Sequence, residues 1–146
     1  MHEKRLQIGI MGSASDQHYP HELETLATEI GKRIAEAGHI LVYGANRDTD
    51  TLPNVAARAA KAAGGLCIGV TYGRDRRVIY GKESADVIIA TGSERGGGRE
   101  FVLVHSCDVV IMIGGGGRIR KLSGRTFAYG LKYSSSVFKT RMRVPN

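Results

Sequence analysis

The chain has 146 residues, enough for about one domain, and its hydrophobic share of 42% and charged share of 24% are ordinary for a globular protein. No stretch approaches the ~18 apolar residues of a membrane span, and the first residues hold no apolar segment of a signal peptide. We therefore expect a cytoplasmic protein in which Cys67 and Cys107 are buried thiols and not a disulfide framework.

The formal net charge of +7 comes from the end of the chain. Residues 1–117 carry 13 Lys and Arg against 14 Asp and Glu, whereas residues 118–146 carry eight basic residues and no acidic one. Because residues 1–117 carry no net positive charge, this part of the chain does not attract a polyanion. We therefore do not expect nucleic acid as the partner, although a basic tail by itself could bind it.

Strands and helices alternate in the predicted order of elements. The strands are short apolar runs that end at turn residues, and the helices are stretches with apolar residues at 3–4 spacing. In chain order we predict a strand over 6–11, a helix over 22–37, a strand over 40–43, a helix over 51–63, strands over 66–71 and 86–90, a helix over 99–106, a strand over 109–113 and a helix from about residue 118. This order predicts a single doubly wound (Rossmann-like) α/β domain over 1–146, with a parallel sheet and helices on both faces.

Glycine-rich loops follow four of the predicted strands, at the sheet edge where doubly wound proteins bind ligands. Such loops let backbone N–H groups surround an anion, and a following helix N-terminus favours negative charge. Four loops at one edge favour a phosphate-bearing ligand, although tight turns alone would also use glycine. The candidate nucleotide- or phosphate-binding residues are Gly12, Ser13, Gly44, Asn46, Gly92, Arg95, Gly96, Gly97, Gly98, Gly114, Gly115, Gly116 and Gly117.

Four side chains in or beside these loops carry candidate chemistry. Arg95 and Arg99 flank three glycines and could hold a phosphate in bidentate fashion, or form a solvated surface pair. Glu100 could orient an arginine or act as an acid or base, but a salt bridge is the simpler expectation. Ser13 could bond a phosphate or a ribose, or cap a helix or turn.

Several known fingerprints are absent from the sequence. There is no G-x-x-x-x-G-K-[ST] segment, and the first predicted strand is followed by G-S-A-S in place of G-x-G-x-x-G. The histidines and cysteines show no spacing of metal ligands. We therefore expect no Walker-type nucleotide hydrolysis, no dinucleotide dehydrogenase, no metal site and no cofactor.

Taken together, these segments resemble the Lonely Guy (LOG) family, also labelled lysine decarboxylase-like, a group of Rossmann-fold nucleotide-binding proteins. The resemblance covers roughly residues 6–117 and rests on Gly12-Ser13, Tyr43-Gly44, Gly64-Gly65, Gly96-Gly97-Gly98-Arg99-Glu100 and Ser106-Cys107-Asp108. It implies a phosphoribohydrolase that cuts the N-glycosidic bond of a cytokinin riboside 5′-monophosphate or of AMP, and it implies a homodimer. By its position before Asp108, Arg99 inherits the role of the family's catalytic arginine.

The chain departs from the LOG pattern after its last predicted strand. The family segment P-G-G-x-G-T-x-x-E is replaced here by residues 114–122, which place Lys121 or Leu122 where the family has its glutamate. Hydrolysis of a nucleoside monophosphate is therefore expected to be weak or lost, and whether the protein is an enzyme stays open. The alternatives are a non-catalytic nucleotide-sensing module and a nucleic-acid binder that uses the basic tail.

Residues 118–146 form an atypical basic segment with few periodic apolar positions. Two explanations stay open for it: a divergent basic tail, or an out-of-frame reading that begins in the glycine run. A shift by one base permits Gly-Thr-Asn-Gln-Glu-Ile from Gly117 onward, which would restore the family's glutamate at position 121. The coding DNA distinguishes the two explanations.

Overall fold

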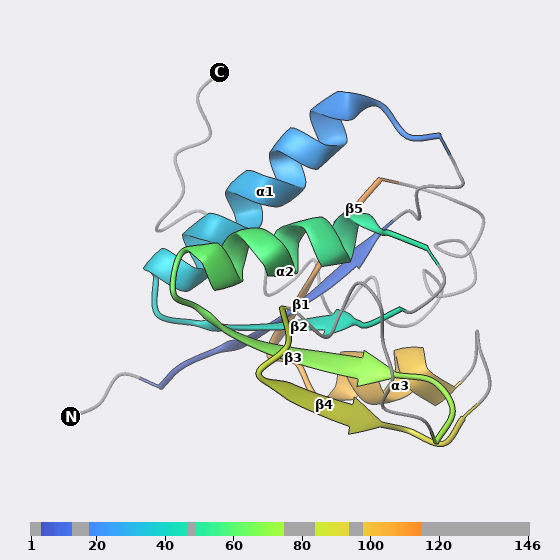
Figure 1. Ribbon diagram of the computed structural model, residues 1–146. Helices are drawn as coiled ribbons and strands as arrows, with labels where there is room; N and C mark the ends of the chain where they lie inside the picture. The colour runs from blue at the N-terminus through green and yellow to red at the C-terminus, as the bar shows by residue number, and fades with distance from the viewer. Residues whose placement is uncertain (1–3, 13–17, 47–48, 75–83, 94–97, 115–146) are drawn as a thin grey trace.

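The computed structural model describes residues 4–12, 18–46, 49–74, 84–93 and 98–114. The elements are β1 (Gln7–Gly12), α1 (His21–Glu36), β2 (Ile40–Gly44), α2 (Leu52–Ala62), β3 (Leu66–Thr71), β4 (Val87–Ala90), α3 (Gly98–His105) and β5 (Val109–Ile113) (Figure 1). Every bound lies within one residue of its predicted position, and the predicted helix from about residue 118 falls outside the described residues. The predicted doubly wound α/β fold is confirmed.

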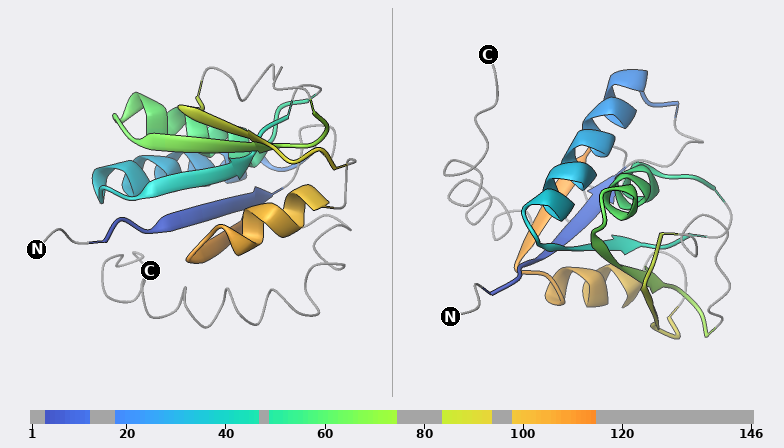
Figure 2. Two further views of the ribbon diagram at one scale, coloured as in Figure 1. Left: turned by 90° about the horizontal axis from the view of Figure 1, so that it is seen from below. Right: turned by 60° about the vertical axis from the view of Figure 1, so that its left-hand side comes forward.

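The five strands form one parallel sheet in the order β4-β3-β2-β1-β5. Helices α1 and α2 cover one face of this sheet and α3 covers the other (Figure 2). From β1 the chain adds β2, β3 and β4 on one side and then returns to place β5 on the other side. The strand order therefore reverses between β1 and β5, which is where open α/β sheets bind ligands.

Two apolar layers hold the helices on the sheet. Successive side chains of a strand point to opposite faces, so Leu41 and Tyr43 pack under α1 and α2 while Val42 points to the α3 side. Val42 is joined there by Val70 of β3 and Leu103 of α3, all three buried. The contact of Leu103 with these strands fixes α3 across β2 and β3 and thereby sets the position of its first turn.

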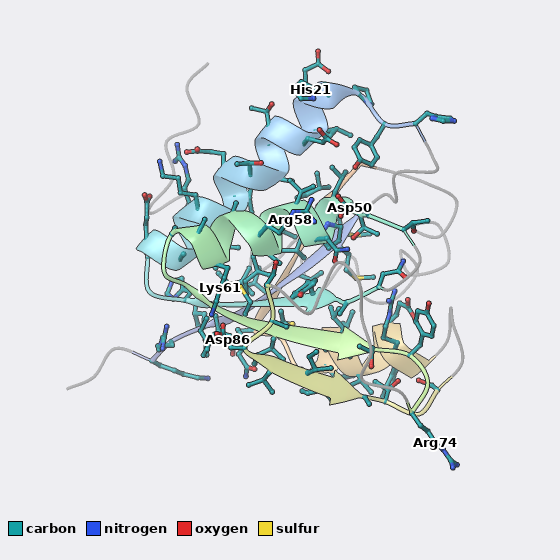
Figure 3. All side chains as sticks on the ribbon, in the orientation of Figure 1. His21, Asp50, Arg58, Lys61, Arg74 and Asp86 are labelled. Atoms are coloured by element: carbon teal, nitrogen blue, oxygen red, sulfur yellow. The ribbon has the colours of Figure 1, made fainter. Side chains whose placement is uncertain are left out.

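Two aspartates join neighbouring strands at the amino edge of the sheet. Asp86, directly before β4, accepts a hydrogen bond from the N–H of Cys67 in β3 at 2.8 Å and also pairs with Lys61 (Figure 3). Asp108, directly before β5, accepts one from the N–H of Gln7 in β1 at 2.9 Å. These carboxylates bond backbone groups that the edge of a sheet leaves unpaired, and so they fix the register of the outer strands.

Hydrogen bonds lower the pKa of both aspartates. Burial by itself would raise the pKa of Asp86, but the hydrogen bonds from Lys61 and from the N–H of Cys67 outweigh it and hold the pKa below its usual range. The hydrogen bond from Gln7 lowers the pKa of Asp108. Both aspartates therefore stabilise the folded chain in their ionised form.

Candidate functional site

Gly12 and Gly114 lie at the carboxyl ends of β1 and β5, the two strands between which the strand order reverses. Gly12 ends β1 and Gly114 follows β5. A Cβ atom on Gly12 would stand 2.6 Å from the carbonyl oxygen of Ile113, so a larger residue would push the ends of the two strands apart. Gly114 has φ 77°, a left-handed conformation that a tight turn alone would also explain.

Five more of the predicted site residues lie at the same edge in the described part of the chain. Gly44 ends β2, Asn46 follows it, Gly92 follows β4, and Gly98 and Arg99 begin α3. The candidates Ser13, Arg95, Gly96, Gly97, Gly115, Gly116 and Gly117 lie outside the described residues. The parallel topology therefore brings the described candidates to one edge of the sheet.

Arg99 is held against the end of β2. Its guanidinium carbon lies 3.0 Å from the position that a Cβ on Gly44 would take, so the group packs directly against residue 44 and would have to shift if that residue were larger. The same carbon lies 5.7 Å from the centre of the Tyr72 ring, within the range of a cation–π contact. The side chain of Arg99 is only 15% exposed, so its position is set by packing and not by solvent.

Glu100 forms the expected salt bridge with Arg99. Its Oε1 accepts hydrogen bonds from Nη2 of Arg99 at 2.7 Å and from Nε at 3.2 Å. The other oxygen, Oε2, is buried and has no hydrogen-bond partner in the described part of the chain. The pair carries no net charge, and it leaves Nη1 of Arg99 outside the salt bridge.

Asn46 and Tyr72 extend this polar group along the edge. The hydroxyl of Tyr72 donates to Oδ1 of Asn46 at 3.4 Å, and the amide nitrogen of Asn46 donates to the hydroxyl of Thr49 at 3.3 Å. Asn46 is only 6% exposed. The two loops after β2 and β3 are thus joined to each other, and Tyr72 connects them to Arg99.

Asp50 is another carboxylate near this edge, and it forms a salt bridge with Arg58. Nη1 and Nη2 of Arg58 donate to its two oxygens at 2.9 and 2.6 Å (Figure 3). Burial would raise the pKa of Asp50, but these hydrogen bonds outweigh burial and lower it. The Asp50–Arg58 pair fixes the start of α2 and has no free oxygen to offer a ligand.

The described residues offer no reactive thiol and no group of three His, Cys, Asp and Glu that could hold a metal. Burial raises the pKa of Cys67 to about 11 and that of Cys107 to about 12. Cys107 donates its S–H to the carbonyl of Leu103 at 3.0 Å. Both thiols stay protonated near neutral pH, and they serve as packing groups.

Sequence reasoning missed Tyr72 and Thr49, which the structure places beside predicted site residues. Tyr72 directly follows the predicted strand over 66–71, so it stands at the carboxyl edge by the same rule that selected the glycines. An aromatic residue at that position was therefore a usable signal. Thr49 carries no comparable signal in the sequence.

The family of this protein is identified by a profile match that covers most of the chain. A profile of the SLOG cluster4 family matches residues 5–129. The chain belongs to the SLOG cluster4 family. SLOG unites the SMF/DprA and LOG proteins, so the resemblance of this SLOG cluster4 chain to LOG-like Rossmann-fold proteins is confirmed. The match also extends past residue 117, where we expected the resemblance to stop.

Relatives of this SLOG cluster4 chain include an uncharacterized protein of Archaeoglobus fulgidus, 33% identical over 113 residues, which are 77% of this chain and 68% of that protein. Two solved structures are similar over 90% of this chain and 73% of their own length. One is the molybdenum cofactor carrier protein of Chlamydomonas reinhardtii, with 29% identity and a TM-score of 0.70. The other is the molybdenum cofactor binding protein of the phototrophic bacterium Rippkaea orientalis, with 27% identity and a TM-score of 0.71.

These findings support a nucleotide-related Rossmann-like protein. No helix in the described ranges is long and apolar enough to cross a membrane. The cytoplasmic location and the absence of a nucleic-acid partner stay predictions.

Proposed function

We propose that this protein binds a small ligand in which a planar heterocycle is joined to a phosphate, with a nucleoside 5′-monophosphate such as AMP as the first candidate. The observation that carries the proposal is the position of Arg99. Its guanidinium is fixed on Gly44 and Tyr72 at the carboxyl edge, where doubly wound sheets bind ligands. A largely buried arginine held at that edge presents a planar group of N–H donors, which can bond the acceptor atoms of a sugar or a heterocycle.

The phosphate would lie in the crevice between β1 and β5, beside Gly12 and Gly114. The loops that follow these strands are glycine-rich in the sequence, and glycine lets backbone N–H groups approach an anion. Arg99 would then contact the ligand through Nη1, because Glu100 already takes Nε and Nη2. This arrangement supports a sugar-side or heterocycle-side position for Arg99.

We propose binding, and not hydrolysis, as the main activity. The glutamate that LOG phosphoribohydrolases carry after the last glycine run is Lys121 or Leu122 here. A lysine would place positive charge beside an oxocarbenium-like transition state, which is the wrong sign for catalysis. Incubation with AMP is expected to release adenine slowly or not at all. Adenine release at the rate of an ordinary enzyme would contradict this part of the proposal.

A second candidate ligand is the molybdenum cofactor, because both solved relatives are named for binding or carrying it. It shares with AMP a heterocycle joined to a phosphate. Titration of the chain with AMP and with cofactor released from a denatured molybdoenzyme separates the two ligands. Tight binding of the cofactor with no response to AMP would favour the carrier role. A homodimer belongs to the same proposal and is checked by the mass of the protein in solution.

The test of the site is Arg99→Ala in isothermal titration with the ligand that binds the parent chain. Loss of a charged hydrogen bond is expected to weaken binding by about 1.5–3 kcal/mol. Arg99→Lys keeps the positive charge but lacks the planar guanidinium with its fixed N–H donors, so it should recover little of the lost affinity. Arg33→Ala is a matched control, because Arg33 also pairs with a glutamate but lies on α1. Equal affinity of Arg99→Ala and the parent for every such ligand would exclude Arg99 from the site.

A further inference from the structure

Glu100 holds a buried carboxylate oxygen that the described part of the chain does not use. Oε1 takes both hydrogen bonds from Arg99, while Oε2 is out of water and has no hydrogen-bond partner among the described residues. An ionised oxygen in this condition is costly, because it has lost its water without gaining a donor.

Glu100 reaches the end of β2 through its salt bridge with Arg99, near the place where related folds carry a ribose-binding acid. Many doubly wound nucleotide-binding proteins carry an acid near the end of the second strand, where it accepts a hydrogen bond from a ribose hydroxyl. Here β2 ends at Gly44, and the next described carboxylate, Asp50, is already taken by Arg58. Glu100 comes from α3, and its carboxylate pairs with the Arg99 guanidinium that packs against Gly44.

Charge and distance fit a sugar at this place better than a phosphate. The Arg99–Glu100 pair is neutral, and a phosphate would be repelled by the unpaired carboxylate oxygen. Gly44 ends the strand next to β1, so the crevice between β1 and β5 is about one and a half strand spacings away, roughly 7 Å. A ribose 5-phosphate spans such a distance, with its phosphate at the crevice and its hydroxyls at Glu100.

We propose that Glu100 accepts a hydrogen bond from a ribose hydroxyl through Oε2, so that the site takes ribonucleoside monophosphates in preference to their deoxy forms. This inference rests on the proposed binding of a nucleotide at the same edge. The side chain keeps 14% of its area exposed. A partial turn about its terminal torsion would bring Oε2 toward this exposed part without moving the rest of the residue.

The experiment titrates the full chain with AMP, with 2′-deoxy-AMP and with 3′-deoxy-AMP. The parent is expected to bind AMP about ten- to hundredfold more tightly than at least one deoxy form, as a hydrogen bond to a charged group implies. Glu100→Ala also releases Arg99 from its salt bridge and so changes the affinity for all three nucleotides, but it should abolish the preference for AMP over that deoxy form. The isosteric Glu100→Gln serves if the alanine variant does not fold, and it should reduce the discrimination. Glu29→Ala on α1 is the matched control.

The outcomes separate the two proposals. Equal affinity of the parent for AMP and both deoxy forms overturns the role of Glu100 and leaves nucleotide binding intact. Discrimination that persists unchanged in a folded Glu100 variant also overturns it. If the parent binds none of the three nucleotides, the nucleotide proposal itself fails, and the role of Glu100 fails with it.

Discussion

The two edges of the parallel sheet differ in how their carboxylates are paired. At the amino edge, Asp86 and Asp108 each give one oxygen to a backbone N–H of the neighbouring strand and the other to a lysine. At the carboxyl edge, Glu100 gives one oxygen to Arg99 and keeps the other unpaired within the described ranges. A fully paired carboxylate stabilises the fold, whereas an unpaired buried oxygen costs stability. The difference distinguishes acids whose two oxygens both serve the fold from an acid with one oxygen that the described fold leaves unpaired.

The largest expected effect is on folding, from removal of a carboxylate at the amino edge. Asp86→Ala leaves the N–H of Cys67 without its acceptor and should lower the free energy of unfolding by about 2 kcal/mol in urea titrations. Asp108→Ala should cost less, because its bond to Gln7 lies nearer to solvent. Glu100→Gln, in contrast, should change stability by less than about 1 kcal/mol. A loss for Glu100→Gln as large as that for Asp86→Ala would mean that both edges serve the fold alone.

A smaller effect on folding, but a clear one on binding, is expected from Gly44→Ala. The new Cβ would stand 3.0 Å from the guanidinium carbon of Arg99, and the flexible end of that side chain would shift to relieve the contact. Stability should fall by less than about 1 kcal/mol, whereas affinity for the parent's ligand should fall about tenfold. Gly9→Ala, which would press on Cys107 away from the carboxyl edge, should lower stability without a matching loss of affinity. If the two variants lose affinity equally, Gly44 has no special role in placing Arg99.

The smallest expected effect is a change in acid sensitivity. The pKa values of Asp86 and Asp108 are lower in the folded chain than in the unfolded chain. Their stabilisation is therefore complete above the unfolded value of about 3.9 and is lost as pH falls through the folded values. Urea titrations between pH 2 and 7 should show a shallower acid decline for the Asp86→Asn, Asp108→Asn double variant than for the parent. An identical decline would show that these carboxylates do not carry the acid response.

The sequence predicted the fold well because its signals are local. Apolar runs that end at glycine and helices with 3–4 spacing fixed each described element to within one residue. The alternation of the two then requires parallel strands and crossover helices. The parallel arrangement also predicted that Gly44, Gly98 and Arg99 lie at one edge, because the carboxyl ends of parallel strands lie together.

The sequence by itself therefore determined the sheet, its two covered faces and the edge where a ligand should bind. It did not determine that Arg99 rests on Gly44 and Tyr72, nor that Glu100 keeps one buried oxygen unpaired. Those features depend on the packing of Leu103, which holds α3 across β2 and β3. They therefore depend on contacts between segments that are distant in the chain. Local periodicity specifies elements, but only their packing in three dimensions decides which side chains meet and which polar atoms are left without a partner.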